Sequence, residues 1–84
     1  MVTLARSKAG HDKNHVYLVI KEDAEFVYLV NGTTKKLDHP KKKKKFHVQL
    51  IKQMPPELWE GLEESQDPDD ITIAKMLDNY HRRK

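Results

Sequence analysis

Short segments rich in β-branched and aromatic residues, separated by turn formers, dominate the first two thirds of the chain and constrain its fold most. Residues 15–20, for example, combine Val, Ile, Leu and Tyr, a composition typical of β-strands. Asn31-Gly32 predicts a two-residue type I′ hairpin turn between two such segments. The predicted strands are residues 2–6, 15–20, 26–30, 33–37 and 46–51.

Short strands with no helix between them favour a small, strongly bent antiparallel barrel, because closing a sheet removes its exposed edges. The chain has 84 residues, and a chain of this size buries only about 60% of its unfolded surface. Its core is therefore small, which excludes a multi-domain enzyme and argues against a deep substrate cleft. We predict a mostly β fold, with a barrel domain at 1–53 and a helical C-terminal extension at 54–84.

The C-terminal extension carries the signals of a helix start and of an amphipathic helix. Asp67 is predicted to be the N-cap, and Pro68 to occupy the first helical position. Trp59, in a short helical turn predicted at 56–62, is expected to anchor the extension to the barrel. Four residues form one stripe along the main helix: Ile73, Met76, Leu77 and Tyr80.

Positive charge is concentrated before the extension. Residues 1–54 hold 12 Lys and Arg against 5 Asp and Glu, whereas residues 55–84 hold 4 against 8. Five consecutive lysines, Lys41 to Lys45, form the centre of the positive field. Contiguous ammonium groups repel one another, so such a run usually serves to bind a polyanion. An isolated lysine run can also be a solvated loop, but here the flanking strand-like segments would hold it in place.

No recognisable motif arranges residues for catalysis or for a metal centre. The chain has no cysteine, which excludes disulfides, thiolate nucleophiles and Cys-ligated zinc. It also lacks a nucleophile elbow and a glycine-rich phosphate loop, and its histidines are scattered. We therefore predict a non-enzymatic protein without metal, cofactor or small-molecule substrate. No apolar run reaches the roughly 20 residues that cross a bilayer, and residues 1–8 lack the apolar stretch of a secretory signal, so we expect a cytoplasmic protein with no membrane partner.

Lysines in the predicted loops suggest that the polyanion is a nucleic acid. Lys8 and Lys13, with His11, lie in the loop between the first two predicted strands, and Lys35 and Lys36 follow the hairpin turn. Loops of a small barrel cluster at its rims, so these groups and the lysine run are expected to form one basic surface. Lysine suits phosphates better than bidentate base reading, so we expect backbone-directed binding of structured RNA.

The aromatic residues of the strand segments are assigned to the core rather than to base stacking, because they are embedded among Val, Leu and Ile. In the last predicted strand, Phe46, Val48 and Leu50 share one face, and the residues between them share the other. The residues given this core assignment are Tyr17, Phe26, Tyr28 and Phe46.

Several motifs, taken together, resemble one family. The loop Ser7-Lys8-Ala9-Gly10-His11-Asp12-Lys13-Asn14-His15 is followed by a Val-rich strand and then by Tyr28-Leu29-Val30-Asn31-Gly32. After these come Lys35-Lys36-Leu37-Asp38-His39-Pro40-Lys41-Lys42-Lys43 and Phe46-His47-Val48-Gln49. In order and spacing, over more than half of the chain, these motifs resemble the bacterial KOW-domain RNA-binding proteins, which are similar to the archaeal and eukaryotic ribosomal large-subunit protein fourteen.

The resemblance implies an SH3-like small five-stranded barrel of the translation-protein type that binds ribosomal or other structured RNA, with the ribosome as a candidate partner. By position, it assigns the first loop and the lysine run to RNA contact. Asn14 stands where the family usually has glycine, and His11 where arginine is usual. The predicted RNA-binding residues are Lys8, Gly10, His11, Asp12, Lys13, Lys35, Lys36, Lys41, Lys42, Lys43, Lys44, Lys45 and His47.

A protein–protein interaction module is the alternative, since SH3-like barrels also bind proteins and a fold does not determine function. The acidic helical tail would then dock on a basic partner, or fold back over the chain's own lysines. The two functions differ in one measurable property. RNA binding weakens steeply as salt is added, whereas an apolar protein contact is insensitive to salt.

Overall fold

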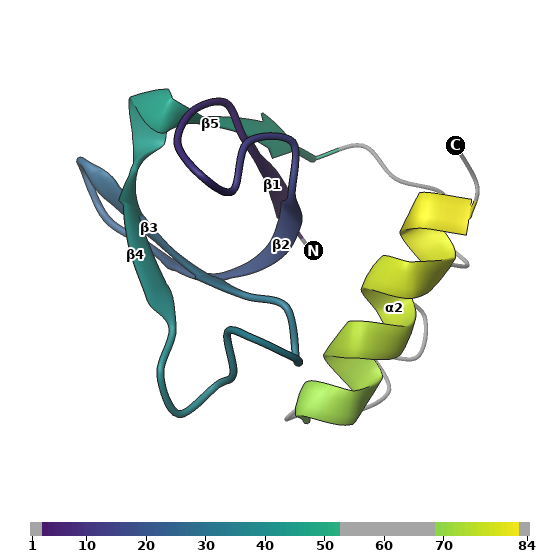
Figure 1. The fold of residues 1–84 in the computed structure, drawn as a ribbon. Coiled ribbons are helices and arrows are strands. Elements are labelled where there is room, and N and C mark those ends of the chain that lie inside the picture. Colours follow the sequence, from purple (N-terminus) through teal and green to yellow (C-terminus); the bar gives the residue numbers. More distant parts are fainter. Residues whose placement is uncertain (1–2, 53–68, 83–84) are drawn as a thin grey trace.

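The computed structural model describes residues 3–52 and 69–82, which form a five-stranded antiparallel sheet and a C-terminal helix (Figure 1). A 3-10 turn, η1 (Lys45–His47), joins the last two strands, and the helix is α2 (Asp70–Arg82). The mostly β class with a helical C-terminal segment is thereby confirmed. The strands are β1 (Leu4–Ser7), β2 (Val16–Glu22), β3 (Phe26–Val30), β4 (Lys41–Lys44) and β5 (Val48–Ile51).

The sheet is strongly bent but is not closed. Its strand order is β4-β3-β2-β1-β5, so the last strand returns to pair with the first. The bend encloses one face of the sheet, and α2 lies against the opposite, outer face (Figure 1). Because η1 carries the chain from β4 to β5 without pairing them, these two strands remain the edges of the described sheet. The expectation of full closure is therefore wrong.

The enclosed inner face carries a small apolar core. Successive side chains of a strand point to opposite faces, so alternate residues of each strand meet inside the bend. Tyr17, at 3% exposure, is the largest of them, and the core assignment of this aromatic residue is confirmed. The buried members of this inner core are Ala5, Tyr17, Val27, Leu29 and Val48.

The outer face of the sheet forms a second core with α2. On the helix, Ile73 is fully buried, and Met76 and Leu77 are 4% exposed. Tyr80 is partly buried against the same cluster, so the predicted stripe is confirmed as the face of α2 that packs. The sheet contributes the intervening residues of its strands: Leu4, Val16, Leu18 and Val30.

Asn31-Gly32 does not form the predicted hairpin, and residues 33–37 are not a strand. The side-chain oxygen of Asn31 accepts hydrogen bonds from the backbone N–H groups of Thr33 and Lys35, and these bonds fold residues 31–35 into a compact loop. Gly32 adopts a φ of 79°, and a Cβ built on it would lie only 2.1 Å from the carbonyl oxygen of Asp70. The glycine therefore permits close approach of the loop to α2, and the true partner of β3 is β4.

The helix begins two residues later than predicted. Asp69 is the N-cap of the described helix, because its side-chain oxygen accepts the backbone N–H of Thr72 at 2.8 Å, and the predicted cap Asp67 lies outside the described residues. The neighbouring Asp70 accepts the backbone N–H of Leu37, which ties the loop before β4 to the start of α2. The predictions for Pro68, for Trp59 and for a turn at 56–62 concern residues outside those that the structure describes.

Candidate nucleic-acid interface

The lysine tract forms an edge strand whose side chains alternate between the two faces of the sheet. Lys43 lies directly opposite Val27 of the inner core, so Lys43 and Lys41 point inward. Lys42 and Lys44 point to the outer face. Exposure follows the same alternation, since Lys41 and Lys43 are half-buried and Lys42 and Lys44 are exposed. The predicted single basic surface is therefore wrong for this tract, which is divided between two environments.

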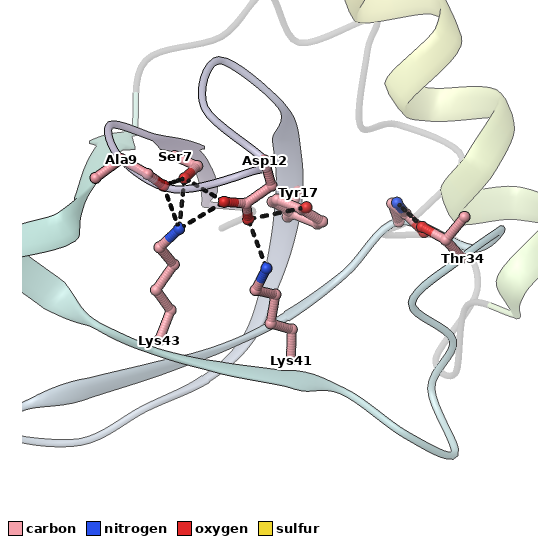
Figure 2. Close-up of polar contacts among 8 residues, drawn as sticks. Ser7, Ala9, Asp12, Tyr17, Thr34, Lys41 and Lys43 are labelled. Carbon is pink, nitrogen blue, oxygen red and sulfur yellow. Dashed lines mark hydrogen bonds and ion pairs between the residues drawn. The ribbon is translucent and has the colours of Figure 1, made fainter.

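Asp12 binds both inward lysines (Figure 2). Its two carboxylate oxygens each lie 2.8 Å from one ammonium nitrogen, Oδ2 from Lys41 and Oδ1 from Lys43. The hydroxyl of Ser7 donates to Oδ1 at 2.9 Å, and that of Tyr17 donates to Oδ2 at 3.1 Å. We call these five residues the inner charge cluster. It joins the loop after β1 to the edge strand β4.

The cluster shifts the pKa of two of its members. Burial by itself raises the pKa of Asp12, but the hydrogen bonds from Lys41, Lys43, Ser7 and Tyr17 outweigh burial and hold this pKa well below its ordinary value. Burial, the negative charge of Asp12 and the hydrogen bond that Tyr17 donates to it raise the pKa of Tyr17 to about 12. Near neutral pH, an ionised carboxylate therefore faces a neutral phenol and two ammonium groups.

The loop of residues 8–15 is held in a tight conformation. Gly10 and Asn14 adopt φ angles of 89° and 72°, in the left-handed region that both residues tolerate. Asn14 thus adopts a positive φ, a conformation that glycine takes readily and asparagine tolerates. The backbone N–H of Lys8 donates to the carbonyl oxygen of His47 at 2.8 Å, which ties the loop to η1.

The predicted site residues of this loop fall into two groups. Lys8, His11 and Lys13 are exposed, as a contact with RNA requires. Asp12 is only 7% exposed, and its carboxylate is directed at Lys41 and Lys43 rather than at solvent. Asp12 therefore positions the loop and the edge strand relative to each other.

The remaining predicted site residues belong neither to the inner charge cluster nor to the loop of residues 8–15. Lys45 forms an ion pair with Glu22 at 2.9 Å, and His47 is half-buried in η1 with its ring 4.2 Å from that of Phe46. The exposed Lys36 and the half-buried Lys35 lie in the loop that approaches α2.

Sequence reasoning missed an outer surface on which lysines and aromatic rings alternate. The Nζ of Lys42 lies 4.2 Å from the ring centroid of Phe26 and 6.0 Å from that of Tyr28. Lys21 lies directly opposite Tyr28 on β2, and its Nζ is 5.3 Å from the same ring. We define the outer lysine–aromatic surface as Lys21, Phe26, Tyr28, Lys42, Lys44 and Phe46.

Phe46 departs most from its predicted place. It was expected on the inner face of the last strand with Val48, but it belongs to η1 and its side chain is 68% exposed. The 3-10 turn breaks the strand alternation one residue before Val48, so the ring is rotated out of the core. Phe26 and Tyr28 are half-buried on the outer face, and neither belongs to a buried core cluster.

A signal for this surface was present in part. The alternation of Phe26 and Tyr28 with Val27 and Leu29 would have placed the two aromatic rings on the face away from the inner core. The lysines carried no such signal, because a tract of identical residues has no period from which a face can be read.

Comparison with known proteins does not assign the site. No protein-family model matches the chain, and no curated protein is similar to it. Within residues 3–52 and 69–82, no group of three or more His, Asp or Glu is placed to hold a metal ion. In the same part of the chain, no helix has the length and apolar character needed to cross a membrane.

Proposed function

We propose that the chain is a non-enzymatic, cytoplasmic RNA-binding protein that contacts ribosomal or other structured RNA through the phosphate backbone. We further propose that its bent sheet is an SH3-like barrel of the KOW type, and that it acts on or near the ribosome. The return of β5 to β1 supports a barrel-like arrangement. The exposed Lys8, His11 and Lys13 support RNA contact by the loop that the family resemblance singled out.

The observation that carries the proposal is the outward placement of Lys42 and Lys44. Lys41 and Lys43 are held by Asp12, and Lys45 by Glu22, so the fold accounts for three of the five lysines. Among the described residues, Lys42 and Lys44 form no ion pair. Two exposed ammonium groups on one edge strand, beside aromatic rings, match the repeating phosphates and bases of a nucleic acid strand.

The inner charge cluster contributes by holding this edge strand in place. Lysine side chains lose considerable conformational entropy when they are fixed, and an edge strand of lysines alone would have little to keep it paired. Because Lys41 and Lys43 anchor β4 through Asp12, Lys42 and Lys44 are presented from a fixed backbone.

The alternative function, a protein-interaction module that docks through its helical tail, has less support. The apolar stripe of α2 is already packed on the sheet, where Ile73, Met76 and Leu77 are buried. Its last turn is charged, with an ion pair between Asp78 and Arg82 at 3.1 Å. The apolar stripe of the described helix is therefore occupied by the sheet, and Ile71 is the large apolar residue that α2 leaves exposed.

The proposal is tested by the salt dependence of RNA binding. For the wild type, the logarithm of the affinity for an RNA hairpin should fall linearly with the logarithm of salt concentration, with a slope of about −0.7 to −0.9 per phosphate contact. Lys42→Gln with Lys44→Gln should weaken binding at low salt and make the slope shallower by about two such contacts. Both residues are exposed, so the variant should remain folded.

The matched control is Lys52→Gln with Lys75→Gln, which removes the same charge from exposed lysines elsewhere. Equal affinity and equal slope for the two double variants would contradict the proposed phosphate contacts. Binding of RNA that does not change with salt, or no binding at all, would instead favour the protein-interaction module.

A further inference from the structure

The exposed ring of Phe46 borders a hollow at the end of the edge strand. This hollow has a volume of about 330 Å³ and is lined by residues of the turn between β2 and β3 and by the chain around η1. The backbone N–H of Lys45 donates a hydrogen bond to the carbonyl oxygen of Glu25 at 2.8 Å, which connects these two lining segments. The lining residues are Ala24, Glu25, Lys44, Lys45 and Phe46.

The position of Phe46 has no explanation in the packing of the fold. An aromatic ring that is 68% exposed retains most of its contact with water, which is unfavourable for an apolar group. Its neighbours are the ring of His47 and the ammonium group of Lys44, whose Nζ lies 5.9 Å from the centroid of the Phe46 ring. A flat apolar surface beside a cation is an arrangement on which nucleic acid bases stack.

The charges around the hollow distinguish a base from a phosphate as its occupant. Glu25 is one of the lining residues, and its carboxylate repels a phosphate and can accept a hydrogen bond from a base amino group. Lys44 also lines the hollow, and Lys42 follows along the same outer face of β4. A nucleic acid strand that passes over β4 would therefore keep its phosphates near Lys42 and Lys44 and direct one base towards Phe46.

We propose that Phe46 and the hollow beside it bind an unpaired RNA base by stacking, while Lys42 and Lys44 hold the adjacent phosphates. This inference rests on the proposed RNA-binding function and makes it more specific. The ligand class is a structured RNA that has a bulge or a loop, rather than a continuous duplex. Bases inside a duplex are stacked on one another, so only an extruded base can reach the ring.

The test compares three RNA hairpins that share one stem. One hairpin is fully paired, the second has a single bulged adenosine, and the third has an abasic nucleotide at the same bulge. The abasic hairpin keeps the phosphate and the bend but removes the stacking base. The wild type should bind the adenosine bulge about 10-fold more tightly than the abasic bulge, in line with the stacking energy of one base.

Phe46→Leu should abolish this difference, because it keeps an apolar side chain but removes the ring on which the base would stack. Phe46→Tyr should retain the difference, because it keeps the ring. Ile71→Ala, at another exposed apolar position with 66% exposure, is the matched control and should behave as wild type.

The outcomes separate this inference from the proposed function. Salt-dependent binding with no preference for adenosine over the abasic bulge would overturn the stacking inference and leave the phosphate contacts intact. A preference that survives in Phe46→Leu would also overturn it, since the base would be bound elsewhere. Failure of the wild type to bind any of the three hairpins would overturn the proposed function and this inference together.

Discussion

Val27 and Lys43 lie directly opposite each other on β3 and β4, so a lysine side chain enters the face of the sheet that holds the inner core. Burying an ammonium group without a partner is costly, and Asp12 offsets the cost with a carboxylate oxygen 2.8 Å from Nζ. The Lys43 side chain is only 10% exposed and that of Asp12 is 9% exposed. This ion pair is therefore shielded from solvent.

Replacing Asp12 with asparagine should destabilise the protein by about 3 kcal/mol. The substitution keeps the shape of the side chain but leaves Lys41 and Lys43 without a counter-charge, and breaking a buried ion pair in this way typically costs about 3–5 kcal/mol. We place the loss at the lower end because the Lys41 side chain is 30% exposed. Urea unfolding followed by circular dichroism measures the change. Asp38→Asn, the same substitution at an exposed position, should change stability by less than about 0.5 kcal/mol.

Lowering the pH should reduce the free energy of unfolding of the wild type more than that of Asp12→Asn. The folded-state pKa of Asp12 is lowered, so its contribution is complete above the unfolded pKa of about 3.9 and is lost as the pH falls below that value. The lowered pKa values of Glu22, Asp23 and Asp69 act in the same direction but are common to both proteins. Unfolding free energies measured between neutral pH and acid should therefore converge for the two proteins. Parallel curves would contradict the role of Asp12.

In base, Tyr17 should ionise well above the ordinary pH range of a tyrosine. Its folded-state pKa is about 12, above the unfolded value of about 10, so its contribution to stability is complete below about pH 10 and is lost as the pH rises through the folded value. An absorbance titration of tyrosinate should show a late step in the wild type. This step should be missing in Tyr17→Phe, whereas Tyr28→Phe should keep it. A titration of Tyr17→Phe that matched the wild type would show that the late step belongs to another residue.

Gly32→Ala should be far more destabilising than Gly10→Ala, although both glycines have positive φ. A Cβ on Gly32 would lie 2.1 Å from the carbonyl oxygen of Asp70 and 2.8 Å from the backbone nitrogen of Ala74, so the loop and α2 would have to separate. At Gly10 the nearest atom is Asp12 Oδ1 at 3.5 Å, an ordinary contact. We expect a loss of about 3 kcal/mol at Gly32 from overpacking and backbone strain, and about 1 kcal/mol at Gly10 from strain alone. Thermal unfolding of the two variants provides the comparison, and equal losses would show that the contact with α2 is unimportant.

The elements with a clear hydrophobic period were predictable. Residues 26–30 form β3 as predicted, and the stripe of Ile73, Met76 and Leu77 is buried against the sheet. In both cases the period of the side chains matches that of the backbone, so the local pattern and the final packing agree. Gly10 and Asn14 also adopt the left-handed angles that their residue types allow.

The predicted hairpin at Asn31-Gly32 is wrong because the local pattern and the final packing disagree there. The dipeptide carries a strong local preference, but the side chain of Asn31 satisfies the backbone of the following loop, and Gly32 is needed for the approach to α2. The approach of Gly32 to α2 joins residues far apart in the chain, so local propensity cannot include it. Together with the hydrogen bonds to Asn31, it outweighed the local preference for a hairpin.

Within the candidate site, the sequence by itself determined the charge, the lysines of the first loop and the presence of residue types that suit phosphate binding. Only the tertiary structure decided which lysines of the tract face solvent and that Asp12 lies between two of them. The physical reason is that five identical residues carry no internal pattern. Their direction is set by the register of β4 on β3 and by a carboxylate that lies 29 positions earlier in the chain than Lys41.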